Sequence, residues 1–384
     1  MKPDWLPDSD EISERVTAIL DRDSINLGPE SGQDRLILML TRSCELRCSY
    51  CFVGLTEDAA GTDHPGTADP VTFASPPGQP LGDMSASTLQ TSIDWLMRSD
   101  RQRLGVQVFG GEPSRRWKHL VTALRYAYDH PRRAGRPIEF LFTTNGLGLR
   151  PALLKRLRDL PVTVQFSLDG GIHGNRFRRP LSGDMDASWQ QTRAAIDILQ
   201  SSGIRWFMNA TLPPAACGEL VERYQWARSE NIPALQINYA TGMSWKAHQV
   251  DQYLEGLHRV LTLHREDPGD FQLFNWQNGA DPAPLCGDMI VDVDGSIYQV
   301  GALFHERRSP QLKATYRIGH LSKVERFTGL RWSLHELTLR TREALADSPV
   351  QCETFFDNVR LGAAVDIVVE RVRADGIPMQ AESA

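Results

Sequence analysis

Short apolar runs alternate along this chain with segments whose apolar residues recur at helical spacing. From residue 35 onward, runs rich in β-branched and aromatic residues predict six strands, at 36–41, 105–109, 138–143, 162–168, 205–211 and 234–239. The predicted helices begin near Ser85, a candidate N-cap, and cover 120–128, 152–160, 189–200, 220–229 and 247–264. This alternation predicts an α/β fold with a parallel sheet. Six units are fewer than the eight of a closed barrel, so we expect a partial (β/α)6 barrel.

The pattern changes near residue 268. The run IVDVDGSIYQV alternates on both sides of Asp294-Gly295, which predicts a β-hairpin. We therefore divide the chain into a lead-in at 1–34, a barrel at 35–267 and a smaller α+β unit at 268–384. The lead-in is polar, and we expect it to be loosely attached. Residues 54–82 are rich in Gly, Pro, Thr, Ala and Asp, and we interpret them as a flexible insertion over the mouth of the barrel.

Charge and hydropathy restrict the classes of partner. The net charge of -6 over 384 residues supplies no basic field for nucleic acid. No stretch reaches the roughly 18 apolar residues of a membrane span, and the first residues lack the apolar run of a signal peptide. We expect a cytoplasmic chain with neither a nucleic-acid nor a membrane partner. Six cysteines are too few for a disulfide scaffold, and three of them fall between positions 44 and 51.

The candidate chemistry lies in that cysteine group. Cys44, Cys48 and Cys51 form a C-x3-C-x2-C triplet directly after the first predicted strand, so three thiolates can converge from one loop. Three ligands on a four-iron cluster leave one iron open for the amine and carboxylate of a small molecule. The alternatives are a zinc site or a chance group of buried cysteines. Structural zinc normally takes four ligands, and no fourth Cys or His lies nearby in the sequence.

With the aromatic Tyr50 and Phe52 around its last cysteine, the triplet resembles the signature of the radical S-adenosylmethionine (radical SAM) superfamily. The run from Gly110 to Pro113, after the second predicted strand, resembles the GGEP element of that family, whose loop receives the methionyl amino group. The resemblance implies one 4Fe-4S cluster and S-adenosylmethionine as cofactors. It implies the three cysteines as metal ligands, and as cofactor-binding residues Phe52, Gly110, Gly111 and Glu112.

Further cofactor contacts are implied where the family places polar groups at strand ends. The run TTNG contains Asn145, the run SLDG contains Ser167 and Asp169, and Asn209 lies on the fifth predicted strand. Asn-Gly and Asp-Gly are also favoured turn pairs, which is the alternative for each run. SLDG followed by His173 and Arg178 resembles a run of peptide- and protein-modifying radical SAM enzymes. The spacer before His173 is shorter, Gly174 replaces an acid, and Arg178 stands one residue late.

The smaller unit resembles the SPASM or twitch extension, which carries auxiliary iron-sulfur clusters. Cys286-Gly287 and the hairpin fit that pattern, but Val300 stands where a cysteine would close the hairpin, and Cys352 lacks the second cysteine of a pair. We interpret the unit as a degenerate cap that helps to bind substrate. A cluster completed by histidine or substrate stays an alternative. Cys217, after the fifth strand, is a candidate catalytic thiol that returns a hydrogen atom; its alternative is a small buried residue.

The resemblance implies reductive cleavage of S-adenosylmethionine to a 5'-deoxyadenosyl radical that abstracts hydrogen from a substrate. The SLDG run and the SPASM-like unit favour a ribosomally synthesised peptide or a protein side chain, with cross-linking, epimerisation or oxidation as the outcome. A small molecule such as a sugar, nucleoside or amino acid is one alternative, and a non-catalytic iron-sulfur protein is another. The expected partners are the substrate, an external electron donor such as flavodoxin or ferredoxin, and a protein that presents the substrate.

Overall fold

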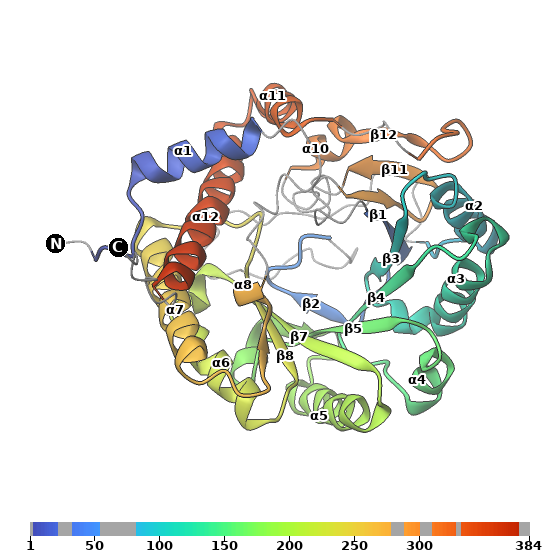
Figure 1. The fold of residues 1–384 in the computed structure, drawn as a ribbon, viewed down its shortest axis with the longest axis horizontal. Helices are drawn as coiled ribbons and strands as arrows, with labels where there is room; N and C mark the ends of the chain where they lie inside the picture. Colours follow the sequence, from blue (N-terminus) through green and yellow to red (C-terminus); the bar gives the residue numbers. More distant parts are fainter. Residues whose placement is uncertain are drawn as a thin grey trace, which may run out of the picture.

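Within the described residues, ten strands form one curved sheet, in the order β12-β11-β10-β1-β3-β4-β5-β7-β8-β9. The computed structural model describes residues 3–21, 33–53, 82–277, 288–299, 309–327 and 332–375. Helices cover the outer face of the sheet, and its inner face encloses the centre of the molecule (Figure 1). All pairings from β10 through β9 are parallel. For the six predicted strands, this is the parallel sheet that the alternation of strands and helices predicts.

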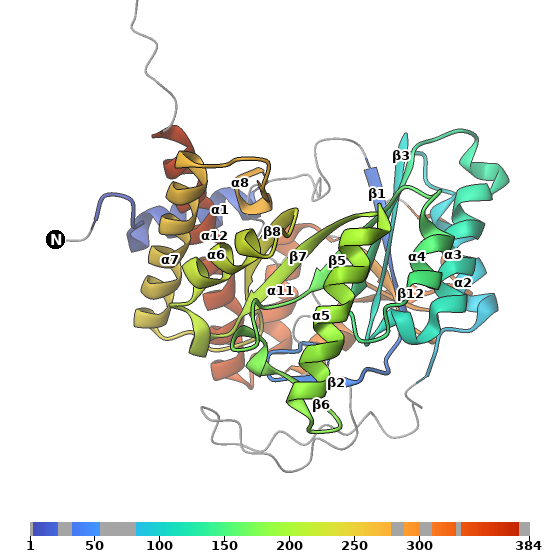
Figure 2. The ribbon, with the colours of Figure 1, turned by 90° about the horizontal axis from the view of Figure 1, so that it is seen from below.

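The strands of this sheet are β1 (Gln33–Thr41), β3 (Arg103–Gly110), β4 (Ile138–Thr144), β5 (Val162–Ser167), β7 (Arg205–Leu212), β8 (Ala234–Tyr239), β9 (Gln272–Leu273), β10 (Met289–Val291), β11 (Ser296–Gln299) and β12 (Arg317–His320). A separate antiparallel pair joins β2 (Leu46–Cys48) to β6 (Arg178–Pro180). Figure 2 shows this pair together at one end of the barrel strands. The six predicted strands are confirmed as β1, β3, β4, β5, β7 and β8.

The helices are α1 (Ser9–Leu20), α2 (Ala86–Leu96), α3 (Trp117–Asp129), α4 (Pro151–Leu157), α5 (Met185–Ser202), α6 (Leu220–Ser229), α7 (Ala247–Glu266), α8 (Phe274–Gln277), α10 (Pro310–Thr315), α11 (Leu334–Ala344) and α12 (Pro349–Ala374). The helix start near Ser85 is confirmed, because the Ser85 side chain accepts a hydrogen bond from the Thr88 amide at 3.0 Å. None of the described helices is long and apolar enough to cross a membrane.

Alternation along β1 separates two packing environments. Leu36 and Leu38 are fully buried in the main core, which also contains Leu89 and Ile93 of α2. Ile37 and Met39, on the opposite face, pack in a second core with Ile290 and residues of α11 and α12. Such a strand is apolar on both faces, which is why its sequence is a continuous apolar run.

The hairpin predicted at Asp294-Gly295 is present and continues the barrel sheet. β10 and β11 pair antiparallel, and Gly295 has a φ of +86°, which favours glycine. β10 also pairs parallel with β1, from Leu36 opposite Met289 to Leu38 opposite Val291. The strands of the smaller unit therefore lie in the same sheet as the barrel, and the boundary at residue 268 stays a proposal.

The N-terminal segment packs more firmly than its polar composition indicates. α1 begins with a capping box between Asp8 and Glu11. Its Arg15 donates to Asp366 and Glu370 on α12, and Ile19 is buried in the second core. Figure 1 shows α1 beside α12. The expectation of a loosely attached segment is wrong for residues 9–20, because the polar residues pair with charges that come from the far end of the chain.

The opening of the partial barrel is covered by α12. Asn358 on α12 accepts a hydrogen bond from the Gly242 amide at 2.8 Å and donates to the Met243 carbonyl at 2.9 Å. Tyr239, at the end of β8, donates to the Asn358 carbonyl at 3.0 Å. These bonds attach α12 to the last long strand of the barrel. The insertion predicted at 54–82 lies outside the described residues except for its final residue.

A buried ion pair joins β1 to the hairpin. Asp292 accepts from Arg42 Nε at 2.9 Å and from Lys313 Nζ at 3.0 Å. Burial by itself would raise the pKa of Asp292, but hydrogen bonding and the charges of Arg42 and Lys313 lower it to about 2. We expect Asp292→Asn to reduce the free energy of unfolding at pH 7 by about 3–5 kcal/mol, because it leaves two buried cations without a counter-ion.

The pH dependence has a definite sign. The folded pKa lies below the unfolded value of about 3.8, so the carboxylate stabilises the fold above that pH and loses its effect as the pH falls toward about 2. Urea unfolding of the iron-free chain at several pH values between about 7 and 3 measures this. Asp294→Asn, the same exchange at an exposed position, is the control. An Asp292→Asn deficit that does not shrink with falling pH would contradict the ion-pair interpretation.

Candidate functional site

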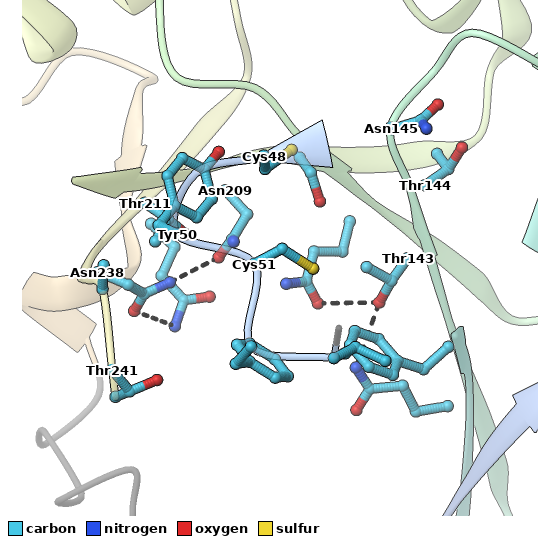
Figure 3. A pocket seen from close by; sticks show the side chains of 18 of the residues that line it. Cys48, Tyr50, Cys51, Thr143, Thr144, Asn145, Asn209, Thr211, Asn238 and Thr241 are labelled. Carbon is cyan, nitrogen blue, oxygen red and sulfur yellow. Dashed lines mark hydrogen bonds between the residues drawn. The ribbon is translucent and has the colours of Figure 1, made fainter. Parts of the chain in front are cut away.

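A cavity of about 520 Å³ opens inside the barrel at the carboxyl ends of its strands. The cysteine loop lines one side of it, and polar side chains of the inner strands line another (Figure 3). Most of the residues proposed from the sequence meet here, namely Cys44, Cys48, Cys51, Phe52, Gly110, Gly111, Glu112, Asn145, Ser167 and Asn209. The parallel sheet brings them together, because its strands end at the same edge.

The cysteine loop is held between β1 and the β2–β6 pair. Cys48 lies opposite Arg178 in that pair. The Cys44 sulfur accepts from the Leu46 amide at 3.4 Å and from Asn145 Nδ2 at 3.6 Å. Burial raises the pKa of Cys44 to about 12 and raises that of Cys48 well above its ordinary value. Without a metal, therefore, these thiols keep their protons.

The donor set fits an iron-sulfur cluster. Three soft sulfur atoms on one loop face the same cavity, and iron displaces the protons of such thiols when it binds. Within the described residues, no group of three or more Cys, His, Asp or Glu side chains is arranged around a single metal ion. A four-iron cluster is larger than a single metal ion, so its three sulfur ligands bind different irons and lie further apart.

The GGEP loop lies directly against the residues that lead into Cys44. The Gly111 amide donates to the Thr41 carbonyl at 2.7 Å, and the Glu112 amide donates to the Ser43 carbonyl at 2.8 Å. A Cβ on Gly110, whose φ is +142°, would lie 2.3 Å from the Thr41 carbonyl oxygen. A Cβ on Gly111 would lie 2.2 Å from the Ser43 oxygen. Glycine is therefore required at both positions for the two loops to pack together.

Glu112 has a fully buried carboxylate that joins the ends of β3 and β4. Oε1 accepts from the Ser114 amide at 2.9 Å and the Thr144 hydroxyl at 2.7 Å, and Oε2 accepts from the Asn145 amide at 2.6 Å. Burial raises the pKa of Glu112 against the opposing effect of these bonds. A carboxylate offers about four acceptor positions, and these three bonds use three of them. Glu112 is also among the residues that line the cavity.

The remaining candidate cofactor contacts differ in their exposure to the cavity. Ser167 ends β5 and lines the cavity. Asn209 on β7 also lines it, and its Oδ1 accepts from Asn238 Nδ2 at 2.7 Å, which leaves its amide nitrogen toward the open space (Figure 3). Asn145 lines the cavity beside Cys44, to whose sulfur it donates at 3.6 Å.

Asp169 has a different position from the one expected for a cofactor contact. It is 3 % exposed and lies behind the cavity lining, where the Tyr50 hydroxyl donates to it and the Thr211 amide donates at 2.9 Å. Burial raises its pKa, opposed chiefly by Arg178. Because Tyr50 lies between Cys48 and Cys51, Asp169 positions the cysteine loop from behind. The expectation of a direct cofactor contact does not match this geometry.

Arg178 and His173 separate in the structure. Arg178 lines the cavity and donates to the Asn145 carbonyl at 2.7 Å and to Asn175 Oδ1 at 2.8 Å, although its place in the sequence is one residue late. His173 is exposed, and the cavity lining does not include it among the described residues. Of these two residues, therefore, the structure brings only Arg178 to the cavity.

The candidate catalytic thiol lies outside the cavity lining. Cys217 is buried in the main core, and its sulfur donates to Gln252 Oε1 on α7 at 3.0 Å. Burial raises its pKa. This position corrects the expectation of a thiol that faces the substrate and agrees with the alternative of a small buried residue. Cys352 lies half-buried on α12, and Cys286 and Val300 are outside the described residues.

Sequence reasoning missed much of the inner wall. The cavity is also lined by uncharged polar residues on or just after the strands and by apolar residues of α12, namely Gln107, Gln165, Thr211, Gln236, Asn238, Thr241, Val365 and Val369. A signal for the polar ones was present, since a buried strand with a glutamine or asparagine at alternate positions must place it inside the barrel. No signal in the sequence indicated that α12 would reach the cavity.

Part of the chain matches a known protein family. Residues 38–219 match the family model of the Radical SAM superfamily. The radical SAM cyclopropyl synthase TigE of Paramaledivibacter caminithermalis is 22% identical over 176 residues, which are 46% of this chain and 34% of TigE. Protein MJ0907 of Methanocaldococcus jannaschii, which is uncharacterized, is 24% identical over 149 residues, 39% of this chain and 43% of that protein. The matches therefore span less than half of these relatives.

Solved structures share the fold at low identity. Native anSMEcpe with bound AdoMet superposes with a TM-score of 0.64 at 14% identity, over 90% of this chain and 99% of that chain. Native anSMEcpe with bound AdoMet and the Kp18Cys peptide gives a TM-score of 0.62 at 15% identity, over 79% of this chain and 82% of that one. The shared region extends beyond the family match into the smaller unit.

Proposed function

This chain carries a radical SAM domain at residues 38–219, and from that premise we propose that it is an enzyme that reductively cleaves S-adenosylmethionine and abstracts hydrogen from a peptide or protein side chain. One observation carries the proposal. The three thiols of the cysteine loop and the GGEP loop open into the same buried cavity. A metal centre held by these thiols and a cofactor held by the GGEP loop would therefore be adjacent, in a space from which water can be excluded.

The radical SAM domain implies one 4Fe-4S cluster and S-adenosylmethionine. Cys44, Cys48 and Cys51 would hold the cluster. The proposed contacts of S-adenosylmethionine are Phe52, the backbone of Gly110 and Gly111, Glu112, Asn145, Ser167 and Asn209. When bound, the pair supplies a one-electron cleavage that gives a 5'-deoxyadenosyl radical capable of removing a substrate hydrogen.

The residues of the chain position the cofactor and exclude water from the cavity. Glu112 fixes the end of β3 against the end of β4, and Asn238 orients the Asn209 amide toward the cavity. Tyr50 and Asp169 hold the cysteine loop from behind. These contacts are preformed, so little reorganisation accompanies the binding of the cofactor.

A peptide or protein substrate is supported by three observations. The SLDG run with Arg178 resembles that of peptide-modifying relatives. A structure of the same fold, anSMEcpe, holds a peptide together with AdoMet. The smaller unit, which we propose begins at residue 268 and acts as a SPASM-like cap, brings Ile290, Val365 and Val369 to the cavity. A cytoplasmic location and an external reductant such as flavodoxin or ferredoxin complete the proposal.

The small-molecule alternative is favoured by the size of the cavity. About 520 Å³ falls within the range of roughly 300–1,000 Å³ that is typical of pockets for small ligands. Co-expression with short open reading frames encoded beside the gene separates the two classes. A mass change in such a peptide supports the peptide substrate, whereas 5'-deoxyadenosine formed only with a sugar, nucleoside or free amino acid supports the alternative.

Anaerobic reconstitution tests the enzymatic activity. We expect the protein to take up roughly four irons and, with dithionite and S-adenosylmethionine, to release 5'-deoxyadenosine as detected by liquid chromatography. A reducible cluster with no release above that of protein-free controls would contradict the enzyme and support an iron-sulfur scaffold.

A further inference from the structure

Three uncharged side chains form a hydrogen-bonded series on the wall made by β3, β4 and β5. Gln107 Nε2 donates to Thr143 Oγ1 at 3.2 Å, and Thr143 in turn donates to Gln165 Oε1 at 3.4 Å (Figure 3). All three residues line the cavity. The direction of the series leaves a carbonyl oxygen at Gln107 and an amide nitrogen at Gln165. Neither atom has a partner within the part of the chain that the structure describes.

The series lies deeper in the barrel than the proposed cofactor contacts. Gln165 and Ser167 point to the same face of β5, and a spacing of two residues places Gln165 about 7 Å further from the strand end. Thr143 and Gln165 are paired across β4 and β5. A cofactor held at the strand ends would therefore have this layer beyond it, in the part of the cavity that stays open to a substrate.

This layer has no charge to offer a substrate. The charged carboxylates and guanidinium that line the described cavity belong to Glu112, Arg178 and Asp288. Glu112 and Arg178 are engaged in the hydrogen bonds described above, and Asp288 pairs with Arg35 at 3.6 Å. A charged substrate group beside Gln107 and Gln165 would lose its hydration without meeting an opposite charge.

We propose that Gln107, Thr143 and Gln165 bind an uncharged amide group of the substrate. An amide has one C=O acceptor and N–H donors, and the series offers the complementary pair. The substrate carbonyl accepts from Gln165 Nε2, and the substrate N–H donates to Gln107 Oε1. The amide belongs either to the peptide backbone or to an Asn or Gln side chain. The inference rests on the proposed function, because that function places the cofactor at the strand ends.

Small amides test this recognition without a known substrate. The full chain, reconstituted with cluster and S-adenosylmethionine, is titrated with N-methylacetamide, acetamide, N,N-dimethylacetamide and acetate, and binding is followed by saturation-transfer NMR. We expect the first two to bind at least tenfold more tightly than acetate and the N–H-free dimethyl compound. Tighter binding of N-methylacetamide identifies a backbone amide, and tighter binding of acetamide identifies a side-chain carboxamide.

Two variants test whether the amides bind at the series of Gln107, Thr143 and Gln165. Gln165→Glu keeps the size of the side chain but replaces the donor with an acceptor, and Thr143→Val interrupts the series. Each is expected to weaken N-methylacetamide binding about tenfold or more. Gln191→Glu, the same exchange at an exposed position of α5, is the control and should bind as the wild type does. Thermal unfolding verifies that each variant is folded.

The outcomes are separable from those of the proposed function. Acetate binding as tightly as the amides, or wild-type amide affinity in folded Gln165→Glu and Thr143→Val, overturns the inference. Cleavage of S-adenosylmethionine without amide binding removes this inference alone. Amide binding that depends on Gln165 in a protein that never cleaves S-adenosylmethionine removes the proposed function instead.

Discussion

Replacing Cys48 with alanine is expected to abolish both the cluster and the release of 5'-deoxyadenosine. Cys48 is one of the three proposed sulfur ligands, and its loss would leave two thiols for a cube that otherwise has three protein ligands. Iron bound after anaerobic reconstitution should fall from about four atoms per chain to less than about one. Iron analysis and the visible absorption of the cluster measure the first effect, and chromatography of 5'-deoxyadenosine measures the second.

The matched control is Cys352→Ala. Cys352 lies half-buried on α12 and outside the cavity lining described here. This variant should keep about four irons per chain and release the nucleoside as the wild type does. Circular dichroism shows whether each variant is folded. Retention of a full cluster by folded Cys48→Ala would contradict the assignment of the ligands. Loss of iron in Cys352→Ala would contradict a single-cluster chain.

Glu112→Gln is expected to weaken the fold and the binding of S-adenosylmethionine together. In the wild type, the Glu112 carboxylate accepts hydrogen bonds from Ser114, Thr144 and Asn145. In the variant, the glutamine NH2 group would face one of these donors instead of accepting from it. Loss of hydrogen bonds to a buried charge costs about 2–4 kcal/mol in the free energy of unfolding. We also propose that this carboxylate accepts from the amine of S-adenosylmethionine, so we expect the affinity for S-adenosylmethionine to fall at least about tenfold.

Urea unfolding and equilibrium dialysis of S-adenosylmethionine measure these two effects. Glu139→Gln is the control, since Glu139 is exposed and pairs with Arg103 at 2.7 Å on the surface. An exposed pair of this kind contributes less than about 1 kcal/mol. Wild-type stability in Glu112→Gln would contradict the role of this carboxylate in joining β3 to β4. If destabilised Glu112→Gln bound S-adenosylmethionine with wild-type affinity, the role of Glu112 would be limited to stabilising the fold.

Local patterns predicted the site where each motif lies at a strand end. The C-x3-C-x2-C triplet, the GGEP run and Ser167 meet in one cavity because parallel strands end at a common edge, which the alternation of strands and helices already indicated. The predicted cofactor contact of Asp169 does not match the structure, because a residue just after a strand can point its side chain into the cavity or away from it. Its carboxylate turns behind the cavity to meet Tyr50. Cys217 follows a barrel strand, but this position in the sequence did not indicate that its side chain would pack against α7.

The sequence by itself determined the order of strands and helices, the hairpin at Asp294-Gly295 and the three thiols of the cysteine loop, because each depends on the periodicity and turn chemistry of nearby residues. Contacts between distant segments were decided only by the tertiary structure. Arg15 of α1 meets Asp366, Asn358 of α12 meets the end of β8, and β10 extends the sheet beside β1. Such pairings depend on packing across hundreds of residues, and no local pattern records them.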